Sequence, residues 1–438
     1  MKPVKVGLLG LGTVGGGTFN VLKRNALEIA RRAGRGIEIT RAAARDYDPA
    51  GLPGIEAITV SDNAFAVVDD PDIDIIVELI GGYEPARELV LKAIASGKHV
   101  VTANKALIAT HGNEIFAAAQ EQGVMVAFEA AVAGGIPIIK AVREGLSANR
   151  IEWIAGIING TGNFILTEMR DKGRDFADVL SEAQKLGYAE ADPTFDVEGI
   201  DAAHKLAILA SIAFGIPLQF DKVYTEGIGH ITRDDVAYAE QLGYRIKHLG
   251  VTRRTENGVE LRVHPTLIPD RRLIANVDGV MNAVLVKADA VGPTLYYGAG
   301  AGAEPTASAV VADLVDVART LTVDPENRVP HLAFQPDALS DLPILSMDDV
   351  KTAYYLRLCV LDRPGVMADI TRILGDGAIS IEALIQKEPP EGQTQVPVIL
   401  LTREVREQQM NEAIQQIELL DSVQGKVTRI RMEHLSSN

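Results

Sequence analysis

The stretch "VKVGLLGLGTVGGG", residues 4–17, decides how the chain begins to fold. Its apolar first half predicts a buried strand, and the glycines that follow predict a tight loop that opens a helix. Gly10, Gly12 and Gly15 have the G-x-G-x-x-G spacing, which permits a tight turn, a close approach of the backbone to a pyrophosphate, and packing of the helix on the strand. A helix N-terminus also offers unpaired N–H groups to an anion. The stretch therefore predicts a dinucleotide-binding loop, with a purely structural glycine turn as the alternative.

Strand and helix patterns alternate from this stretch to about residue 135. The first helix is expected to run to about Arg32, and apolar strands follow at 37–45, 72–80, 97–103 and 124–130, with helical patterns at 84–96 and 112–122. Continuous apolar strands that alternate with helices are typical of a parallel, doubly wound α/β sheet. We therefore predict a Rossmann-type nucleotide-binding domain over residues 1–135.

The pattern changes from residue 136 onward. Residues 136–322 mix helices and strands and predict a second, α+β domain, whose helix 305–322 is expected to pack back on the first domain. A proline-rich connector covers 323–350. The tail, 351–438, has the order βαββαβ with a loop at 388–395, which predicts a ferredoxin-like domain.

Composition narrows the classes of function. A formal net charge of −16 argues against binding along a nucleic acid backbone, and the longest apolar run is too short to span a membrane. The N-terminus does not resemble a secretory signal, and the single cysteine, Cys359, fits a reducing compartment, so a cytoplasmic location is expected. Cys359 lies in a strand pattern, which argues against an aldehyde dehydrogenase with a thiohemiacetal intermediate.

The end of the second strand bears on the choice of cofactor. An acidic residue at this position binds the ribose hydroxyls of NAD, whereas an arginine pairs with the 2′-phosphate of NADP. Arg45 and Asp46 offer both. Arg45 directly follows the apolar strand, so we favour NADP, with NAD and a simple surface arginine left open.

Two lysines are candidates for chemistry. Lys105 follows the carboxyl end of a strand, the edge at which doubly wound sheets bind ligands, although a lysine there is often only solvated. Asp201 and Lys205 are four residues apart on a predicted helix, 199–213, that is apolar on every face and therefore buried. Burial favours the neutral form of Lys205 and the carboxylate opposes it, an environment suited to a general acid or base. The alternative is a surface ion pair.

Five carboxylates lie between Glu190 and Asp201, in "EADPTFDVEGID". Carboxylates beside such a lysine could bind the ammonium group of a substrate. This combination favours an amino-acid substrate over a simple hydroxy acid.

Five motifs together resemble homoserine dehydrogenase: "GLGTVGGG", "TANKALIATHG", "NGTGNFI", "LGYAEADPTFDVEGIDAAHKLAIL" and "GAGAGAEPTASAV". The resemblance covers essentially the whole chain, and the tail is similar to an ACT domain. It implies an enzyme that interconverts L-homoserine and L-aspartate 4-semialdehyde with NAD(P), in threonine, methionine and isoleucine biosynthesis. It also makes residues 136–322 a catalytic and dimerisation domain. Another NAD(P)-dependent amino-acid semialdehyde dehydrogenase, or a non-catalytic nucleotide-sensing regulator, remain as alternatives.

The resemblance also assigns roles to particular residues. It implies that Lys205 carries the hydroxyl proton and that Lys105 orients the reacting oxygen. Substrate would be bound by Glu190 and Asp201, with Asp196 in support and Asn159, Gly160 and Thr161 forming a wall between nicotinamide and substrate. The implied cofactor-binding positions, beside the three loop glycines and Arg45, are Thr13, Val14, Thr102, Lys105, Gly187 and Gly302.

A monovalent cation such as sodium is implied at Glu129, Val132, Gly134 and Ile136, where the residues alone would indicate only a glycine turn. In the tail, "LDRPGVMADI" matches the part of ACT domains that binds amino acids, and by resemblance the effector would be threonine. The resemblance further implies a homodimer or homotetramer.

Overall fold

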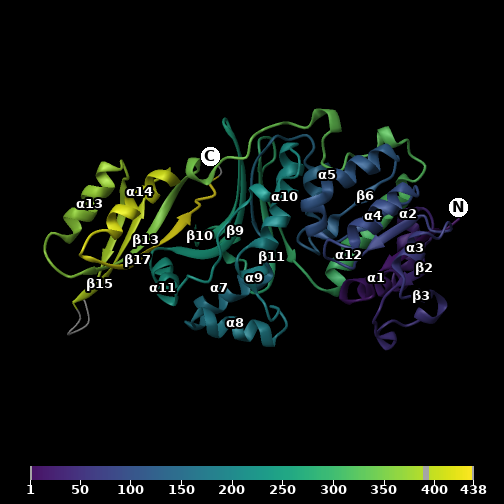
Figure 1. Ribbon diagram of the computed structural model, residues 1–438, viewed down its shortest axis with the longest axis horizontal. Coiled ribbons are helices and arrows are strands. Elements are labelled where there is room, and N and C mark those ends of the chain that lie inside the picture. Colours follow the sequence, from purple (N-terminus) through teal and green to yellow (C-terminus); the bar gives the residue numbers. More distant parts are fainter. Residues whose placement is uncertain (1, 388–393, 437–438) are drawn as a thin grey trace. The chain divides into compact units, whose positions relative to one another are not determined.

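The computed structural model describes residues 2–387 and 394–436 (Figure 1). The chain forms two compact units. The first unit consists of Met1–Gly160, Asp201–Val223 and Val280–Leu342, and the second of Thr161–Ile200, Tyr224–Gly279 and Pro343–Asn438.

A six-stranded parallel sheet forms the centre of the first unit. Its order is β3-β2-β1-β4-β5-β6, which is the order of a dinucleotide-binding doubly wound sheet and confirms the predicted fold class. The strands are β1 (Val4–Leu9), β2 (Ile37–Ala43), β3 (Thr59–Ser61), β4 (Ile75–Glu78), β5 (His99–Thr102) and β6 (Val126–Ala127). Strands β1, β4 and β5 are buried almost throughout, as the continuous apolar runs require.

The helices that connect these strands are α1 (Thr13–Arg24), α2 (Ala26–Ala33), α3 (Ala64–Val68), α4 (Ala86–Ala95) and α5 (Lys105–Glu121). The sequence predicted one helix from the glycine loop to about Arg32, and this was wrong in detail. The helix ends at Arg24, Asn25 leaves the helical conformation, and a second helix begins at Ala26. Asparagine has a low helix propensity, which favours an interruption at this position.

Helix α12 (Ala303–Thr320) packs beside α1 in the first unit (Figure 1). Its apolar face, including Ala307, Val310 and Leu314, belongs to the same core as Val6, Leu8 and Phe19. Gly17 of α1 makes this contact close, since a Cβ atom there would lie 2.4 Å from the carbonyl oxygen of Ala303.

The rest of the first unit contains one long buried helix and three antiparallel strands. The strands are β7 (Ile151–Ile157), β11 (Met281–Ala288) and β12 (Gly292–Ala299), with β11 in the middle, and α6 (Ile138–Lys140) is a single turn. Helix α10 (Ile200–Phe214) is buried from Asp201 to Phe214, as its all-round apolar pattern requires.

The second unit contains a sheet in the order β9-β10-β17-β13-β15-β14. Its strands are β8 (Tyr224–Thr225), β9 (Tyr244–Thr255), β10 (Gly258–Pro269), β13 (Lys351–Leu361), β14 (Ile381–Gln386), β15 (Gln395–Thr402), β16 (Val405–Arg406) and β17 (Val423–Met432). Its helices are α7 (Gly160–Lys172), α8 (Phe176–Lys185), α9 (Thr194–Val197), α11 (Arg233–Gln241), α13 (Val366–Asp376) and α14 (Glu407–Glu418).

The C-terminal segment of this unit has the predicted βαββαβ order. Strands β17, β13, β15 and β14 are neighbours in an antiparallel arrangement, which is the ferredoxin-like plan. The predicted loop at 388–395 lies mostly outside the described residues. Strand β17 also pairs in parallel with β10, so the tail shares one sheet with residues 244–269.

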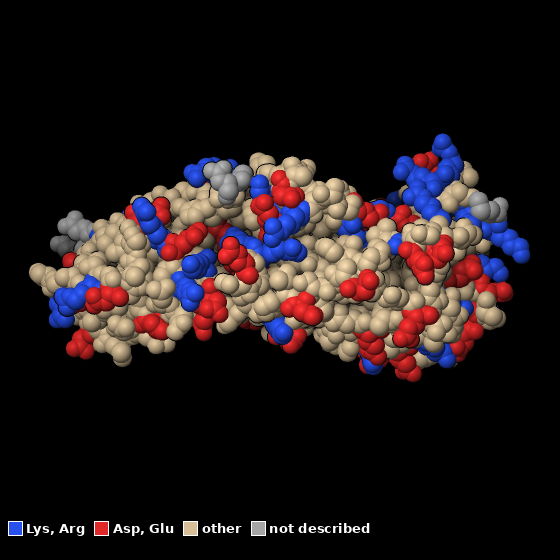
Figure 2. Space-filling model, turned by 90° about the horizontal axis from the view of Figure 1, so that it is seen from above, with Lys and Arg blue, Asp and Glu red and all other residues tan. Residues whose placement is uncertain are grey.

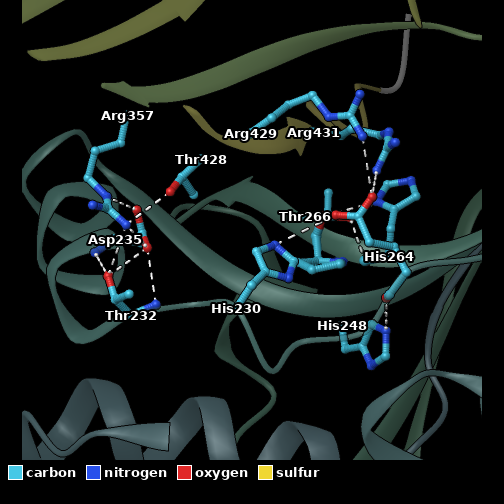
Figure 3. A network of polar contacts seen from close by, with 12 residues as sticks. His230, Thr232, Asp235, His248, His264, Thr266, Arg357, Thr428, Arg429 and Arg431 are labelled. Carbon is cyan, nitrogen blue, oxygen red and sulfur yellow. Dashed lines mark hydrogen bonds and ion pairs between the residues drawn. The ribbon is translucent and has the colours of Figure 1, made fainter. Parts of the chain in front are cut away.

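Buried charges join the C-terminal strands to the rest of the second unit (Figure 3). Arg357 on β13 donates from Nε to Asp235 on α11 at 2.6 Å, and Arg431 on β17 donates to Glu226 at 2.7 Å. Asp235 and Arg431 are fully buried. Ionised groups remain stable in the interior only when they are paired and hydrogen-bonded, so these contacts hold the strands in one arrangement.

Charged side chains of both signs are interspersed over most of the face shown in Figure 2. Among the helices that the structure describes, none is both long and apolar enough to cross a membrane.

Candidate active site

Asp201 and Lys205 lie one turn apart on α10 and are in direct contact. The ammonium group of Lys205 is 2.7 Å from Oδ2 of Asp201, and the two side chains are 11% and 7% exposed. The contact has the spacing that the sequence predicts for one helical face, and the burial excludes the alternative of a surface ion pair. A paired lysine thus stands at the edge of the apolar interior.

Lys105 reaches the same carboxylate from another element. It is the first residue of α5, directly beyond the carboxyl end of β5, and its ammonium group is 3.1 Å from Oδ1 of Asp201. Its side chain is 32% exposed. Asp201 therefore holds two lysines, one on each oxygen.

The end of β7 completes this cluster. The side-chain amide of Asn159 donates to Oδ2 of Asp201 at 2.9 Å, and Lys205 donates to the carbonyl oxygen of Ile158 at 2.7 Å. The next residue, Gly160, has no room for a side chain, because a Cβ atom would lie 2.7 Å from the carbonyl oxygen of Val280. The backbone at 158–160 is thereby held against the lysine.

The electrostatics of the cluster favour an ionised Asp201. Burial alone would raise the pKa of this carboxyl group, but the ammonium groups of Lys205 and Lys105 lower it below its ordinary range. The neighbouring His204 serves packing, since its ring stacks on Phe220 with centroids 4.0 Å apart and burial lowers its pKa to about 4. The arrangement places two lysines beside a carboxylate that favours its ionised form.

Four other predicted positions lie in the second unit. Glu190 is exposed in the loop between α8 and α9, and Asp196 is half-buried on α9. Thr161 donates its hydroxyl to the carbonyl oxygen of Tyr188 at 2.5 Å, and Gly187 has a left-handed backbone with φ of 74°. Asp192, another carboxylate of the stretch 190–201, accepts hydrogen bonds from the amide and hydroxyl of Thr194 and so caps a turn.

The glycine loop fits a nucleotide. Gly10 has φ of +100°, and a Cβ atom there would lie 2.7 Å from the carbonyl oxygen of Leu79. A Cβ atom at Gly15 would lie 2.0 Å from the carbonyl oxygen of Gly10, whereas one at Gly12 would meet nothing within 4 Å. Gly12 caps α1 without a side-chain hydrogen bond. The loop thus has both the tight turn and the open face that a pyrophosphate requires.

The predicted cofactor positions other than Gly187 lie around the carboxyl edge of the same sheet or elsewhere in its unit. Thr13 is exposed and Val14 half-buried at the start of α1, and Arg45 is exposed shortly after β2. Thr102 is buried at the end of β5, while Gly302, with φ of +130°, precedes α12.

Comparison with known proteins identifies the family. Residues 10–129 match the NAD binding domain of homoserine dehydrogenase, residues 137–315 match homoserine dehydrogenase, and residues 354–419 match the ACT domain. The homoserine dehydrogenase of Pseudomonas aeruginosa is 71% identical over 436 residues and covers 100% of both chains.

The chain belongs to the homoserine dehydrogenase family.

A crystal structure of the homoserine dehydrogenase from Thiobacillus denitrificans is 72% identical, with a TM-score of 0.95 and coverage of 100% of this chain and 99% of the other. A hyperthermophilic archaeal homoserine dehydrogenase, solved in complex with NADPH, is 26% identical, with a TM-score of 0.62. The match covers 74% of this chain and 98% of the archaeal chain. The chain is therefore an NAD(P)-dependent oxidoreductase that acts on the CH–OH group of homoserine.

The loop for which a cation is predicted also has a distinctive geometry. Val132 and Gly134 are buried, and the carbonyl oxygens of both lack a hydrogen-bond donor among the residues that the structure describes. The carboxylate of Glu129 accepts the N–H groups of Ile139 and Lys140, and burial raises its pKa to about 7. Ile136 is buried in the same loop. Free buried carbonyl oxygens suit a hard monovalent cation.

No side-chain metal centre accompanies this loop. In the described ranges, 2–387 and 394–436, no group of three or more His, Cys, Asp or Glu side chains could hold a metal ion. A cation here would depend on backbone oxygens.

Sequence reasoning missed two contributors to the site. The carbonyl oxygen of Ile158 has no signature in the sequence, because any residue supplies a carbonyl. Asn104 caps α5 through Oδ1, which accepts the amide of Leu107 at 3.1 Å, and so fixes the start of the helix that carries Lys105. The asparagine directly before a helical pattern could have indicated this cap.

Proposed function

We propose that Lys205 transfers the substrate hydroxyl proton during the interconversion of L-homoserine and L-aspartate 4-semialdehyde. In oxidation, its neutral amine accepts the O–H proton as the C4–H bond breaks, and in reduction its ammonium group returns a proton to the aldehyde oxygen. The nicotinamide, when bound, accepts or supplies the hydride at substrate C4. The observation that carries this proposal is the contact of both lysines with the buried Asp201.

Lys105 has the second role in this proposal. Its partly exposed ammonium group can hydrogen-bond the reacting oxygen and stabilise negative charge that develops there. Asp201 keeps both lysines in place, and its Oδ1 could also accept the substrate ammonium, since a carboxylate oxygen can accept more than one hydrogen bond. Asn159 and Gly160 form the proposed backbone wall.

The roles of Glu190, Asp196, Thr161 and Gly187 are proposed from the resemblance of their motifs. Glu190 would bind the substrate ammonium with Asp196 in support, Thr161 would continue the wall, and Gly187 would close on the cofactor. The proposed domains are those of the sequence analysis: 1–135 for nucleotide, 136–322 for catalysis, 323–350 as connector and 351–438 for regulation.

NADP is the proposed preferred cofactor, with NAD also accepted. Support comes from the exposed Arg45 beyond β2, which can pair with a 2′-phosphate, and from the NADPH complex of the archaeal relative. A monovalent cation such as sodium is proposed at Glu129, Val132, Gly134 and Ile136. It would be held by backbone oxygens and would stabilise the loop between β6 and α6.

Threonine is the proposed effector, bound at residues 361–370 of the ACT domain. Helix α13 begins there at Val366, and the preceding residue, Gly365, has a left-handed backbone and provides no side-chain cap. Regulation through this domain is supported by a continuous route of contacts in the second unit. Arg431 of β17 binds Glu226, and the amide of Ile228 donates to the carbonyl oxygen of Val197 at the end of α9. We propose that a change in the ACT domain reaches the segment that carries Asp196 through these contacts.

We also propose a place for the enzyme in threonine, methionine and isoleucine biosynthesis, a homodimeric or homotetrameric assembly, and a cytoplasmic location.

The first test of the function is the reduction of NADP or NAD with L-homoserine. Turnover with homoserine supports the proposal, and the absence of turnover with either nucleotide would overturn it. The second candidate, another amino-acid semialdehyde as substrate, predicts higher kcat/KM for a different amino alcohol in the same assay.

A further inference from the structure

Glu78 is a buried acid at the carboxyl edge of the parallel sheet. It is the last residue of β4, between β1 and β5, and it is 0% exposed. A glutamate is rarely buried without a structural or functional requirement, because the loss of hydration must be offset by hydrogen bonds. The contacts of its two oxygens show what this requirement is.

The two oxygens bind different elements. Oε1 accepts the amide N–H groups of Ile80 at 2.8 Å and Gly81 at 3.0 Å, and Oε2 accepts the hydroxyl of Thr102 at 2.7 Å. One side chain therefore holds the loop that follows β4 and also the end of the neighbouring strand β5.

The loop held by Oε1 lies against the nucleotide-binding turn. A Cβ atom at Gly10 would lie 2.7 Å from the carbonyl oxygen of Leu79 and 3.4 Å from the amide nitrogen of Ile80. Gly81 and Gly82 have positive φ values of 80° and 72°, so the loop turns sharply at this point. Its position fixes one wall beside the glycine turn.

The contact of Oε2 leads to Lys105. The hydroxyl oxygen of Thr102 accepts the amide of Asn104 at 3.0 Å, and the side chain of Asn104 both donates to the carbonyl oxygen of Gly82 at 2.7 Å and caps α5. Lys105 is the first residue of that helix. Glu78, Thr102 and Asn104 thus form a hydrogen-bond network that connects the loop at 80–82 with the start of the helix that carries Lys105.

We propose that Glu78 is a positioning residue of the reaction, which fixes the cofactor loop at 80–82 and the start of the helix that carries Lys105. The inference rests on the proposed roles of the glycine loop and of Lys105. Glu78 is fully buried and both of its oxygens bind neighbouring groups, so it acts through these neighbours and not by contact with substrate. A carboxylate suits this task because it accepts on both sides, and hydrogen bonds to an ionised acceptor are stronger than neutral ones.

Glutamine cannot replace both functions. If its amide oxygen accepts the N–H groups of Ile80 and Gly81, its NH₂ group faces Thr102, whose hydroxyl then loses its acceptor. Glu78→Gln should therefore preserve the volume of the side chain but remove the hydrogen bond from Thr102. Displacement of a positioned group by about 1 Å can lower a rate by about 10²-fold, so partial release should cost about tenfold.

The experiment compares full-length enzyme with Glu78→Gln, Thr102→Val and the double variant. The dissociation constant of NADPH is measured by fluorescence titration, kcat and the KM of homoserine by steady-state kinetics, and Tm by calorimetry. Glu407→Gln is the matched control, because Glu407 is 2% exposed and accepts hydrogen bonds from Arg431 and Tyr354 on the C-terminal segment. It should lower Tm while the dissociation constant of NADPH stays at the wild-type value.

The expected result is an NADPH dissociation constant about tenfold higher and a kcat about tenfold lower in Glu78→Gln, with a smaller change in the KM of homoserine. The double variant should be no worse than the more impaired single variant, since Glu78 acts through Thr102. If Glu78→Gln does not fold, Thr102→Val tests the same hydrogen-bond network. Thr102→Ser, which keeps the hydroxyl, should then recover the NADPH affinity that Thr102→Val loses.

A lower Tm with wild-type NADPH affinity and kcat in both Glu78→Gln and Thr102→Val would overturn the proposal and leave Glu78 a purely structural residue. Lys105→Met, measured in parallel, separates this result from a failure of the proposed function. If Lys105→Met retains full kcat, the role of Lys105 is overturned, while weaker NADPH binding in Glu78→Gln still supports the positioning of the loop.

Discussion

Replacement of Asp201 by asparagine removes the negative charge that the two lysines share and keeps the shape of the side chain. Asp201 contacts Lys205 at 2.7 Å and Lys105 at 3.1 Å in a site where it is 7% exposed. A carboxylate this close stabilises the protonated form of a neighbouring base by about one to three pH units. Homoserine oxidation requires neutral Lys205 in the proposed mechanism. The pH at half-maximal kcat should therefore fall by about one to three units in Asp201→Asn.

The assay is the initial rate of NADP reduction at saturating homoserine across the alkaline and neutral range. Asp201→Asn should also lose stability, because the removal of one partner from a buried ion pair costs about 3 to 5 kcal/mol. Asp235→Asn is the matched control, since Asp235 is fully buried and paired with Arg357 but lies on α11. Asp235→Asn should lower Tm in the same way and leave the pH at half-maximal kcat unchanged. An unchanged or higher midpoint in Asp201→Asn would refute the reasoning.

Three further predictions concern the cofactor, the effector and the response to acid. Arg45→Ala should raise the KM of NADP by about tenfold and leave the KM of NAD nearly unchanged, since only NADP has the 2′-phosphate; equal changes in steady-state KM would exclude that contact. Asp362→Ala, in the exposed loop before α13, should raise the threonine concentration needed for half inhibition by about tenfold, and full-length enzyme that ignores threonine would remove the regulatory proposal. Burial lowers the pKa values of His99, His204 and His248 from 6.5 to about 4, so the unfolded chain binds more protons between these limits. Calorimetry should show stability that is complete above about pH 6.5 and is lost on acidification toward pH 4, by about 1.4 kcal/mol per pH unit for each histidine, and a flat profile would contradict this.

The sequence predicts the parts of the fold that depend on local pattern. The parallel sheet follows from the apolar strands that alternate with helices, and the glycine loop follows from its spacing. The burial of α10 and the contact between Asp201 and Lys205 follow from helical periodicity alone.

Contacts between distant segments could not be predicted from pattern. Lys105 and Asp201 are 96 positions apart, and no periodicity indicates that α5 and α10 bring them within 3.1 Å. The pairing of β17 with β10 is of the same kind, because a strand edge carries no sequence signal for its partner. The sequence places Glu78 only in an apolar strand, since its hydrogen bonds depend on a loop and on the neighbouring strand.

This sheet pairing also affects how regulation is tested. Removal of residues 351–438 would expose β10 and leave Glu226 without Arg431, so a loss of activity in the truncated chain would not distinguish regulation from instability. Point variants in the full chain avoid this problem.

The most direct test of the account is the kcat of Lys205→Ala for homoserine oxidation at saturating NADP. A residue that carries the hydroxyl proton should contribute about 10² to 10⁴-fold, so the variant should turn over at least about 10²-fold more slowly while it still binds NADPH. Turnover at the wild-type rate would contradict the assignment of Lys205 as the proton-transferring residue.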